Sequence, residues 1–215
     1  MFVREVSLRH FRNLGCQSVF LSPGVNVFYG KNAQGKTNLL ESVFLLSCPK
    51  GFRQGRERDY IAFDETAARV LLHYHAFGRD QTLELQLSAD ARKSILLNGV
   101  PIRKNGELAS QFCTVLFEPG HLDLVKEGPE QRSVVLSLKL GECELVEQTV
   151  GESPILLLDD VMSELDRARQ QYVKSSFGAR QVLITNCGRA RPSKKVTAFS
   201  VADGRVTRLD PPPSA

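Results

Sequence analysis

A glycine-rich stretch near the N-terminus constrains this chain more than any other feature. It fits the pattern G-x-x-x-x-G-K-[ST] at every fixed position and consists of Gly30, Lys31, Asn32, Ala33, Gln34, Gly35, Lys36 and Thr37. The apolar residues 25–29 before it predict a buried strand, and residues 38–46 after it predict a helix with an apolar face. A strand, a glycine-rich loop and a helix in this order indicate a phosphate-binding P-loop. An ordinary glycine-rich turn is the alternative, but it would not require a strand before it and a helix after it.

The motif assigns a role to each kind of residue in the loop. Its glycines let backbone N–H groups and the helix N-terminus face a chain of phosphates. Lys36 is expected to reach the β- and γ-phosphates, and the Thr37 hydroxyl is expected to bind Mg²⁺.

Length and composition predict a cytoplasmic protein with one substantial core. A chain of 215 residues can bury one core and a small satellite lobe. No apolar run approaches the roughly 18 residues that a membrane-spanning helix needs, and Arg4, Glu5 and Arg9 stand where a signal peptide would be apolar. The five cysteines are scattered without a C-x-x-C pair, so we expect small buried apolar side chains at Cys16, Cys48, Cys113, Cys143 and Cys187.

Two clusters of basic residues stand out from a mild net charge of +4. The first contains Lys50, Arg53, Arg56 and Arg58. The second contains Arg189, Arg191, Lys194 and Lys195. Either cluster suits contact with nucleic acid phosphates, and either is equally compatible with a solvated loop.

The strand and helix patterns predict an α/β fold. Residues 2–8 and 16–21 read as a hairpin, residues 69–74, 82–87 and 94–97 as antiparallel strands, and Asn98-Gly99 as a hairpin turn. Apolar strands over 113–117, 154–158 and 182–185 alternate with helices over 133–148 and 166–176, and residues 196–200 and 205–207 form a last hairpin. We therefore expect a sheet with parallel members, antiparallel strands at its edge, and a disordered tail over 211–215.

Acidic residues at the end of the strand over 154–158 predict the second half of a nucleotide site. Asp159 is expected to hold Mg²⁺ through water, and Asp160 stands where a general base would polarise the attacking water. Two acids at a solvated strand end would look the same, but the upstream P-loop favours the functional interpretation. The segment that follows has the place and form of a D-loop and consists of Ser163, Glu164, Leu165 and Asp166.

Residues 157–166 resemble the Walker B and D-loop segments of the ABC-type, SMC-like ATPases, and most closely those of the RecF family of bacterial repair proteins. Residues 8–14, 30–40, 97–99, 116–122 and 126–132 are similar to other segments of that family, so the resemblance touches nearly the whole chain. It implies a P-loop NTPase fold, an ABC-type ATPase head with an antiparallel β subdomain. The head would span residues 1–210, with an N-terminal lobe over 1–132 and a C-terminal lobe over 133–210.

The resemblance also implies ligands and partners. ATP with Mg²⁺ would be the cofactor, Arg12, Asn13 and Asn38 would lie near the nucleotide, and Thr185 would sense the γ-phosphate. A charged turn is the alternative for Arg12 and Asn13. Double-stranded and gapped DNA would be bound, RecO and RecR would cooperate in loading RecA, and ATP would join two heads into a homodimer.

The chain departs from the family at one place. In RecF proteins a long helical arm and an S-x-G-type signature motif stand between the segment matching 128–132 and the helix that is here expected at 133. Both are missing, and Gly128-Pro129 is a poor substitute because proline lacks the N–H group that a phosphate needs. We therefore expect the chain to retain ATP binding but to hydrolyse ATP poorly. We also expect the ATP-dependent dimer to be lost. Whether the chain is an enzyme stays open.

Two other functions stay open. A nucleoside monophosphate kinase also carries a P-loop in a short chain, but about 120 residues separate Lys36 from the acidic strand end, and such kinases depend on an arginine-rich lid. The other is a non-catalytic remnant of an ATPase head that binds ATP or DNA.

Overall fold

Two six-stranded sheets make up most of the protein. The computed structural model describes residues 1–49, 56–123, 129–188, 192–193 and 195–209. The antiparallel sheet has the order β2-β1-β4-β5-β6-β7 and consists of β1 (Phe2–Arg9), β2 (Gln17–Phe20), β4 (Ala67–Ala76), β5 (Arg79–Ser88), β6 (Ser94–Leu97) and β7 (Val100–Pro101). The expected antiparallel strands thus form a sheet of their own instead of lying at the edge of the parallel sheet.

The second sheet has the order β12-β11-β3-β10-β9-β8. Its strands are β3 (Val25–Tyr29), β8 (Thr114–Phe117), β9 (Ile155–Leu158), β10 (Val182–Asn186), β11 (Val196–Ala202) and β12 (Arg205–Leu209). Only β12 runs antiparallel to its neighbour among the pairs in this sheet. The carboxyl ends of β3, β9 and β10 therefore meet at one edge, where α/β proteins bind ligands.

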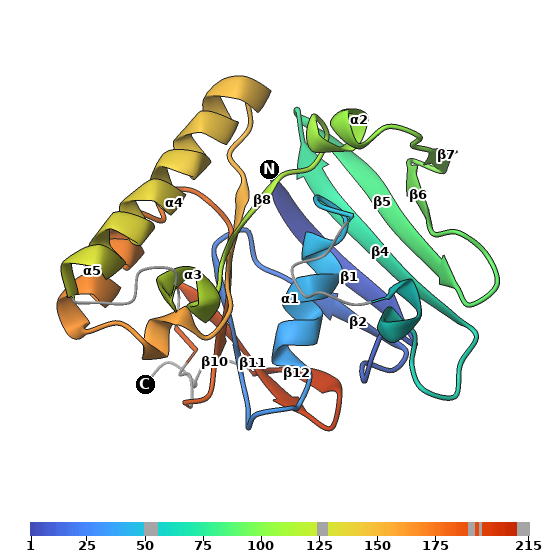
Figure 1. Ribbon diagram of the computed structural model, residues 1–215, viewed down its shortest axis with the longest axis horizontal. Coiled ribbons are helices and arrows are strands. Elements are labelled where there is room, and N and C mark those ends of the chain that lie inside the picture. Colours follow the sequence, from blue (N-terminus) through green and yellow to red (C-terminus); the bar gives the residue numbers. More distant parts are fainter. Residues whose placement is uncertain (50–55, 124–128, 189–191, 194, 210–215) are drawn as a thin grey trace.

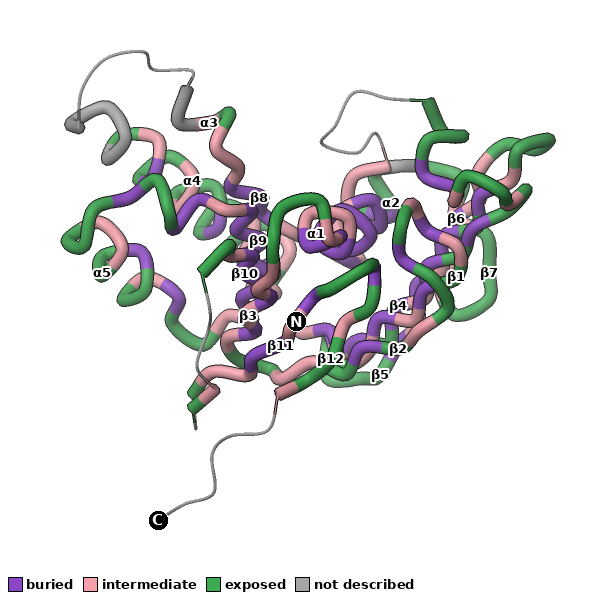
Figure 2. Tube along the Cα trace, turned by 90° about the horizontal axis from the view of Figure 1, so that it is seen from below, coloured by how far each residue is buried: buried purple, intermediate pink, exposed green. Residues whose placement is uncertain are grey.

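The helices are α1 (Lys36–Phe44), α2 (Asn105–Ala109), α3 (Pro119–Asp123), α4 (Pro129–Val150) and α5 (Arg167–Ser175), with the 3₁₀ turns η1 (Glu57–Tyr60) and η2 (Val161–Ser163). Helix α1 lies between the two sheets, and α4 and α5 cover the far face of the second sheet (Figure 1). Seen from below, buried residues run continuously through β9 and most of β10, whereas they alternate with less buried ones along strands of the antiparallel sheet such as β4 (Figure 2).

The layers explain why the central strands are apolar throughout. In β9, Ile155 and Leu157 pack in the core that α1 shares with both sheets, whereas Leu156 and Leu158 pack in the core under α4 and α5. A strand covered on both faces has no side that favours polar residues, so its sequence reads as a continuous apolar run.

Helix α4 begins earlier than its apolar pattern predicts. The pattern starts at 133, but the helix starts at Pro129 and runs through the expected boundary between lobes at 132/133. Proline suits the first turn of a helix because the N–H group that it lacks has no partner there. Leu136 and Cys143 of this helix are buried, and they face the core that α4 shares with the second sheet.

The expectation that all cysteines are buried is wrong for two of them. Cys113 and Cys143 are buried and Cys48 is half-buried, whereas Cys16 and Cys187 are exposed. The exposed pair lies in turns after β1 and β10, where the chain leaves the sheets. The predicted tail over 211–215 lies outside the described residues.

Candidate nucleotide-binding site

The P-loop connects β3 to α1 and fits tightly against the turn that follows β1. Gly35 has a φ of 108°, in the region that favours glycine. A Cβ atom at this position would lie 2.8 Å from Leu14 Cδ2 and 2.9 Å from Asn13 Oδ1. The second fixed glycine of the motif is therefore required both by its backbone angle and by its neighbours.

Lys36 is buried at the centre of the loop, with 7 % of its surface exposed. Its Nζ donates hydrogen bonds to the carbonyl oxygens of Gly30 and Lys31, both at 2.8 Å. The loop thus curls round its own ammonium group, which carries the positive charge that a phosphate chain needs.

Two threonine hydroxyls hold the Asp159 carboxylate at the sheet edge. Thr37 Oγ1 donates to Asp159 Oδ1 at 2.9 Å, and Thr185 Oγ1 donates to the same oxygen at 2.8 Å. Thr185 Oγ1 also accepts a hydrogen bond from the Asp160 backbone N–H at 2.8 Å. The first turn of α1 and the ends of β9 and β10 are joined through this one carboxylate.

These oxygens fit a magnesium ion. Mg²⁺ in nucleotide sites takes one or two protein oxygens and fills its other positions with phosphates and water. Thr37 and Asp159 supply such a hydroxyl and carboxylate side by side. In the part of the chain that the structure describes, no group of three or more His, Cys, Asp or Glu residues could hold a metal by itself.

Asp160 lies beside Asp159 with a left-handed backbone, at a φ of 53°. Ser163 Oγ donates to the Asp160 carbonyl at 2.6 Å. The Cys187 thiol donates to Asn32 Oδ1 at 2.9 Å and lies 3.5 Å from Asp160 Oδ2. Partial burial and the Asp160 charge raise the pKa of Cys187, so this thiol stays protonated at neutral pH.

Asn13 ties the turn after β1 to the P-loop. Its Oδ1 accepts from Asn38 Nδ2 at 2.7 Å, and its Nδ2 donates to the Ala33 carbonyl at 3.4 Å. Gln34 is held from the other side, because its Oε1 accepts from the Asp203 N–H at 2.6 Å.

A cavity of about 570 Å³ opens between these segments. Its walls are formed by Asn13, Asn32, Ala33, Gly35, Lys36, Thr37, Asn38, Asp160 and Thr185. Every one of these residues is among those predicted from the sequence, so segments far apart in the chain converge on one polar hollow.

Arg12 lies elsewhere than its neighbour Asn13. Its Nε is 2.6 Å from the Oε2 of Glu41, a fully buried residue of α1, and its guanidinium stacks over the Tyr60 ring at 4.8 Å. Arg12 is not among the residues that line the cavity. The predicted role beside the nucleotide therefore stays a prediction, and the observed contacts tie α1 to η1.

The D-loop residues form the passage from η2 to α5. Leu165 is buried, and the Asp166 side chain caps α5 by accepting the Arg169 N–H at 2.9 Å. Of the predicted DNA contacts, Arg56 and Arg58 are exposed, whereas Lys50 and Arg53 lie outside the described residues, as do Arg189, Arg191 and Lys194. Lys195 is exposed.

Two residues near the site escaped the sequence analysis. Glu41 is a charged residue within the apolar run of α1, and that contrast was the available signal. Cys187 comes directly after β10. It lies near the P-loop because β10 pairs with β3, the strand that leads into the loop. No local pattern marks it.

The fold and the site define a P-loop NTPase head of the ABC type. Residues 2–202 match the family described as "RecF/RecN/SMC N terminal domain", and the chain belongs to that family. A DNA replication and repair protein RecF from Lachnospira eligens is 33% identical over 146 residues, which are 68% of this chain and 40% of that protein. The chain thus spans about 40% of the length of this relative.

Solved structures agree on the fold. A structure described as the recombination mediator protein RecF with ATP in the RecFOR pathway matches with a TM-score of 0.86 at 22% identity, covering 97% of this chain and 99% of the other. The SMC head domain from Thermotoga maritima matches with a TM-score of 0.65 at 17% identity, covering 97% and 98%. Among the described helices, none combines the length and the apolar character needed to cross a bilayer.

Proposed function

We propose that this chain is an ATP-binding head of a RecF-like DNA replication and repair protein. The observation that carries the proposal is the Asp159 carboxylate, which is held by the hydroxyls of Thr37 and Thr185, two residues that line the cavity. This geometry supports a nucleotide whose phosphates would lie along the loop of residues 30–37 and whose Mg²⁺ would be held by Thr37 and Asp159.

Each residue has one role in the proposal. Backbone N–H groups of the loop and the start of α1 bind the phosphates, and Lys36 compensates their charge. Mg²⁺, when bound, neutralises charge on the phosphate oxygens. Asp160 orients the attacking water. Thr185 is hydrogen-bonded to the Asp159 carboxylate and to the Asp160 N–H, so that loss of the γ-phosphate would affect the positions of both aspartates.

Hydrolysis is proposed to be weak. Catalysis of phosphoryl transfer consists almost entirely of positioning and charge stabilisation. In RecF-like heads part of that machinery comes from the signature motif of a second head, and this chain has no such motif ahead of α4. Binding without efficient turnover is the expected behaviour.

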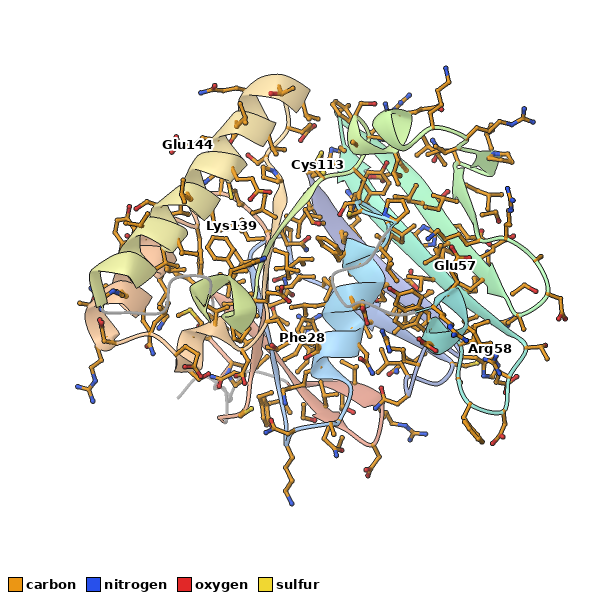
Figure 3. The ribbon with its side chains drawn as sticks, in the orientation of Figure 1. Phe28, Glu57, Arg58, Cys113, Lys139 and Glu144 are labelled. Carbon is orange, nitrogen blue, oxygen red and sulfur yellow. The ribbon has the colours of Figure 1, made fainter. Side chains whose placement is uncertain are left out.

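Duplex and gapped DNA are the proposed macromolecular ligands, with RecO and RecR as partners in loading RecA by family likeness. The supporting residues are Arg56, which precedes η1, and Arg58 within η1. Figure 3 shows Arg58 and Glu57 beside the antiparallel sheet, on the opposite side of the molecule from Lys139 and Glu144 of α4. The DNA surface would then lie on the antiparallel sheet.

A calorimetric titration of the protein with ATP and Mg²⁺ tests the proposal. We expect Lys36→Ala to weaken binding at least tenfold, because the triphosphate loses its buried cationic partner. Lys174→Ala is the matched control, since Lys174 is an exposed lysine of α5 that is not among the residues lining this cavity. Equal affinities of the parent and Lys36→Ala would refute the proposed site.

A further inference from the structure

Three side chains with nucleophilic or titratable groups converge outside the nucleotide site, at the end of the hairpin between β1 and β2. The Cys16 Sγ lies 3.5 Å from His10 Nε2. On the other side of the ring, His10 Nδ1 lies 3.2 Å from Glu65 Oε1. Thiol, imidazole and carboxylate thus form a continuous row.

The fold places these residues from three separate segments. Antiparallel pairing of Leu8 with Gln17 brings the positions just beyond them, His10 and Cys16, to the same end of the hairpin. The His10 carbonyl accepts the Ala62 N–H at 2.8 Å, which anchors the segment that carries Glu65. Backbone hydrogen bonds therefore hold both neighbours of His10 in place: the segment that carries Cys16 and the segment that carries Glu65.

The order of the groups fixes their chemistry. Since Glu65 accepts the proton on Nδ1, Nε2 presents its lone pair to the Cys16 thiol. A nucleophile within reach of a base, with the base oriented by a third group, is the arrangement that activates cysteine. Cys16 is exposed, so a reagent has access to it.

The thiol opens onto a cationic hollow. A cavity of about 370 Å³ is lined by Cys16, Arg9 and Arg69, together with parts of β1, β2 and β4. Arg69 is paired with Glu84 through two hydrogen bonds of 2.7 and 2.8 Å. Arg9 is exposed and has no ion pair within the described ranges, so its charge is available to an anionic ligand.

We propose that Cys16 is a modification site that exchanges with small anionic disulfides. The Cys16 thiol transfers its proton to His10 Nε2, and the resulting thiolate attacks one sulfur of the disulfide. The S–S bond of the reagent breaks, Cys16 keeps one half as a mixed disulfide, and the other half leaves as a thiolate that takes up the proton from His10. The disulfide is the only oxidant consumed, and the carboxylates of the reagent contact Arg9.

The test follows the rates of modification of the whole chain by two aromatic disulfides. Dithiobis(nitrobenzoate) is anionic and dithiodipyridine is neutral, and peptide mass mapping separates the products at Cys16 from those at Cys187. We expect Cys16 to react at least tenfold faster than Cys187, and His10→Asn to slow Cys16 at least tenfold with both reagents. Asparagine suits the left-handed backbone of His10, which has a φ of 50°.

Two further variants separate the parts of the proposal. Arg9→Gln is expected to slow only the anionic reagent. His73→Asn, at an exposed position of β4, is the matched control that changes neither rate. His10→Gln serves if His10→Asn fails to fold. A rate at Cys16 that is unchanged in a folded His10 variant overturns the proposal, as does modification of Cys16 no faster than of Cys187.

Discussion

Charge compensation explains the placement of the buried polar residues. Lys36 is satisfied by two carbonyl oxygens, Asp159 by two hydroxyls, and Glu41 by the Arg12 guanidinium. Buried charges are tolerated only with such partners. The Lys36 contacts follow from the motif, since Gly30 and Lys31 belong to the same loop, whereas the hydroxyls that hold Asp159 come from other segments of the chain. The Arg12 contact joins residues 29 positions apart and could not be predicted from either segment alone.

Tyr74 links stability to alkaline pH. It is 1 % exposed and packs edge-on against Phe112 with ring centroids 5.2 Å apart, and burial raises its pKa to about 12. The unfolded tyrosine ionises near pH 10, so the stabilisation present below pH 10 is lost as the pH rises toward 12. At pH 11 the parent should lose about 1.4 kcal/mol more than Tyr74→Phe, relative to pH 8. Urea unfolding of both proteins at the two pH values measures this, and equal losses would contradict it.

Secondary structure elements were predictable where their periodicity is strong and local. The strands β3, β8, β9 and β10 and the helix α5 lie within a few residues of their expected positions. The start of α4 was missed because Pro129 carries no apolar signal, although it is compatible with a first turn. Strand patterns alone do not state which strands pair, so they did not separate the strands into two sheets. The family resemblance did predict the antiparallel β subdomain, and the observed sheet order confirms it.

Asp166 illustrates how one residue serves an element and a site. It belongs to the predicted D-loop, yet its carboxylate caps α5 through the Arg169 N–H at 2.9 Å. We expect Asp166→Ala to lower the free energy of unfolding by about 1 kcal/mol, whereas Asp166→Asn retains the cap and most of the stability. Urea denaturation compares the three proteins. An equal loss in both variants would mean that the carboxylate charge matters and the cap does not.

The arrangement of the whole molecule puts the proposed nucleotide and DNA surfaces on different parts of the head. The nucleotide cavity lies at the carboxyl edge of the second sheet, and Arg58 lies beside the antiparallel sheet (Figure 3). Helix α1 contacts both sheets through Leu39, Leu40 and Val43, so it is the element through which the two surfaces would communicate. The convergence of the cavity walls was predictable from motifs, because parallel strands bring their carboxyl ends together.

Binding to duplex DNA should be electrostatic and independent of sequence. We expect affinity to fall steeply with salt, and Arg58→Gln to reduce the slope of log K against log salt by about 0.9 if its phosphate contact is lost. Arg208→Gln, an exposed arginine on β12, is the control. Fluorescence anisotropy at several salt concentrations gives the slopes. An affinity that does not change with ionic strength would exclude this mode of binding.

The missing signature motif determines the behaviour of the whole molecule with ATP. In the proposed function, nucleotide enters the cavity that Lys36 and Thr37 line, but a second head has no signature motif to close over the γ-phosphate. We therefore expect ATP with Mg²⁺ not to induce a dimer, and hydrolysis to stay near background because part of the positioning and charge stabilisation is gone. Asp160→Asn, which would trap ATP-bound dimers of a complete head, should leave the assembly state unchanged. Light scattering of both proteins with and without ATP measures this, and a nucleotide-dependent dimer in either would mean that another segment, such as residues 127–132, replaces the signature.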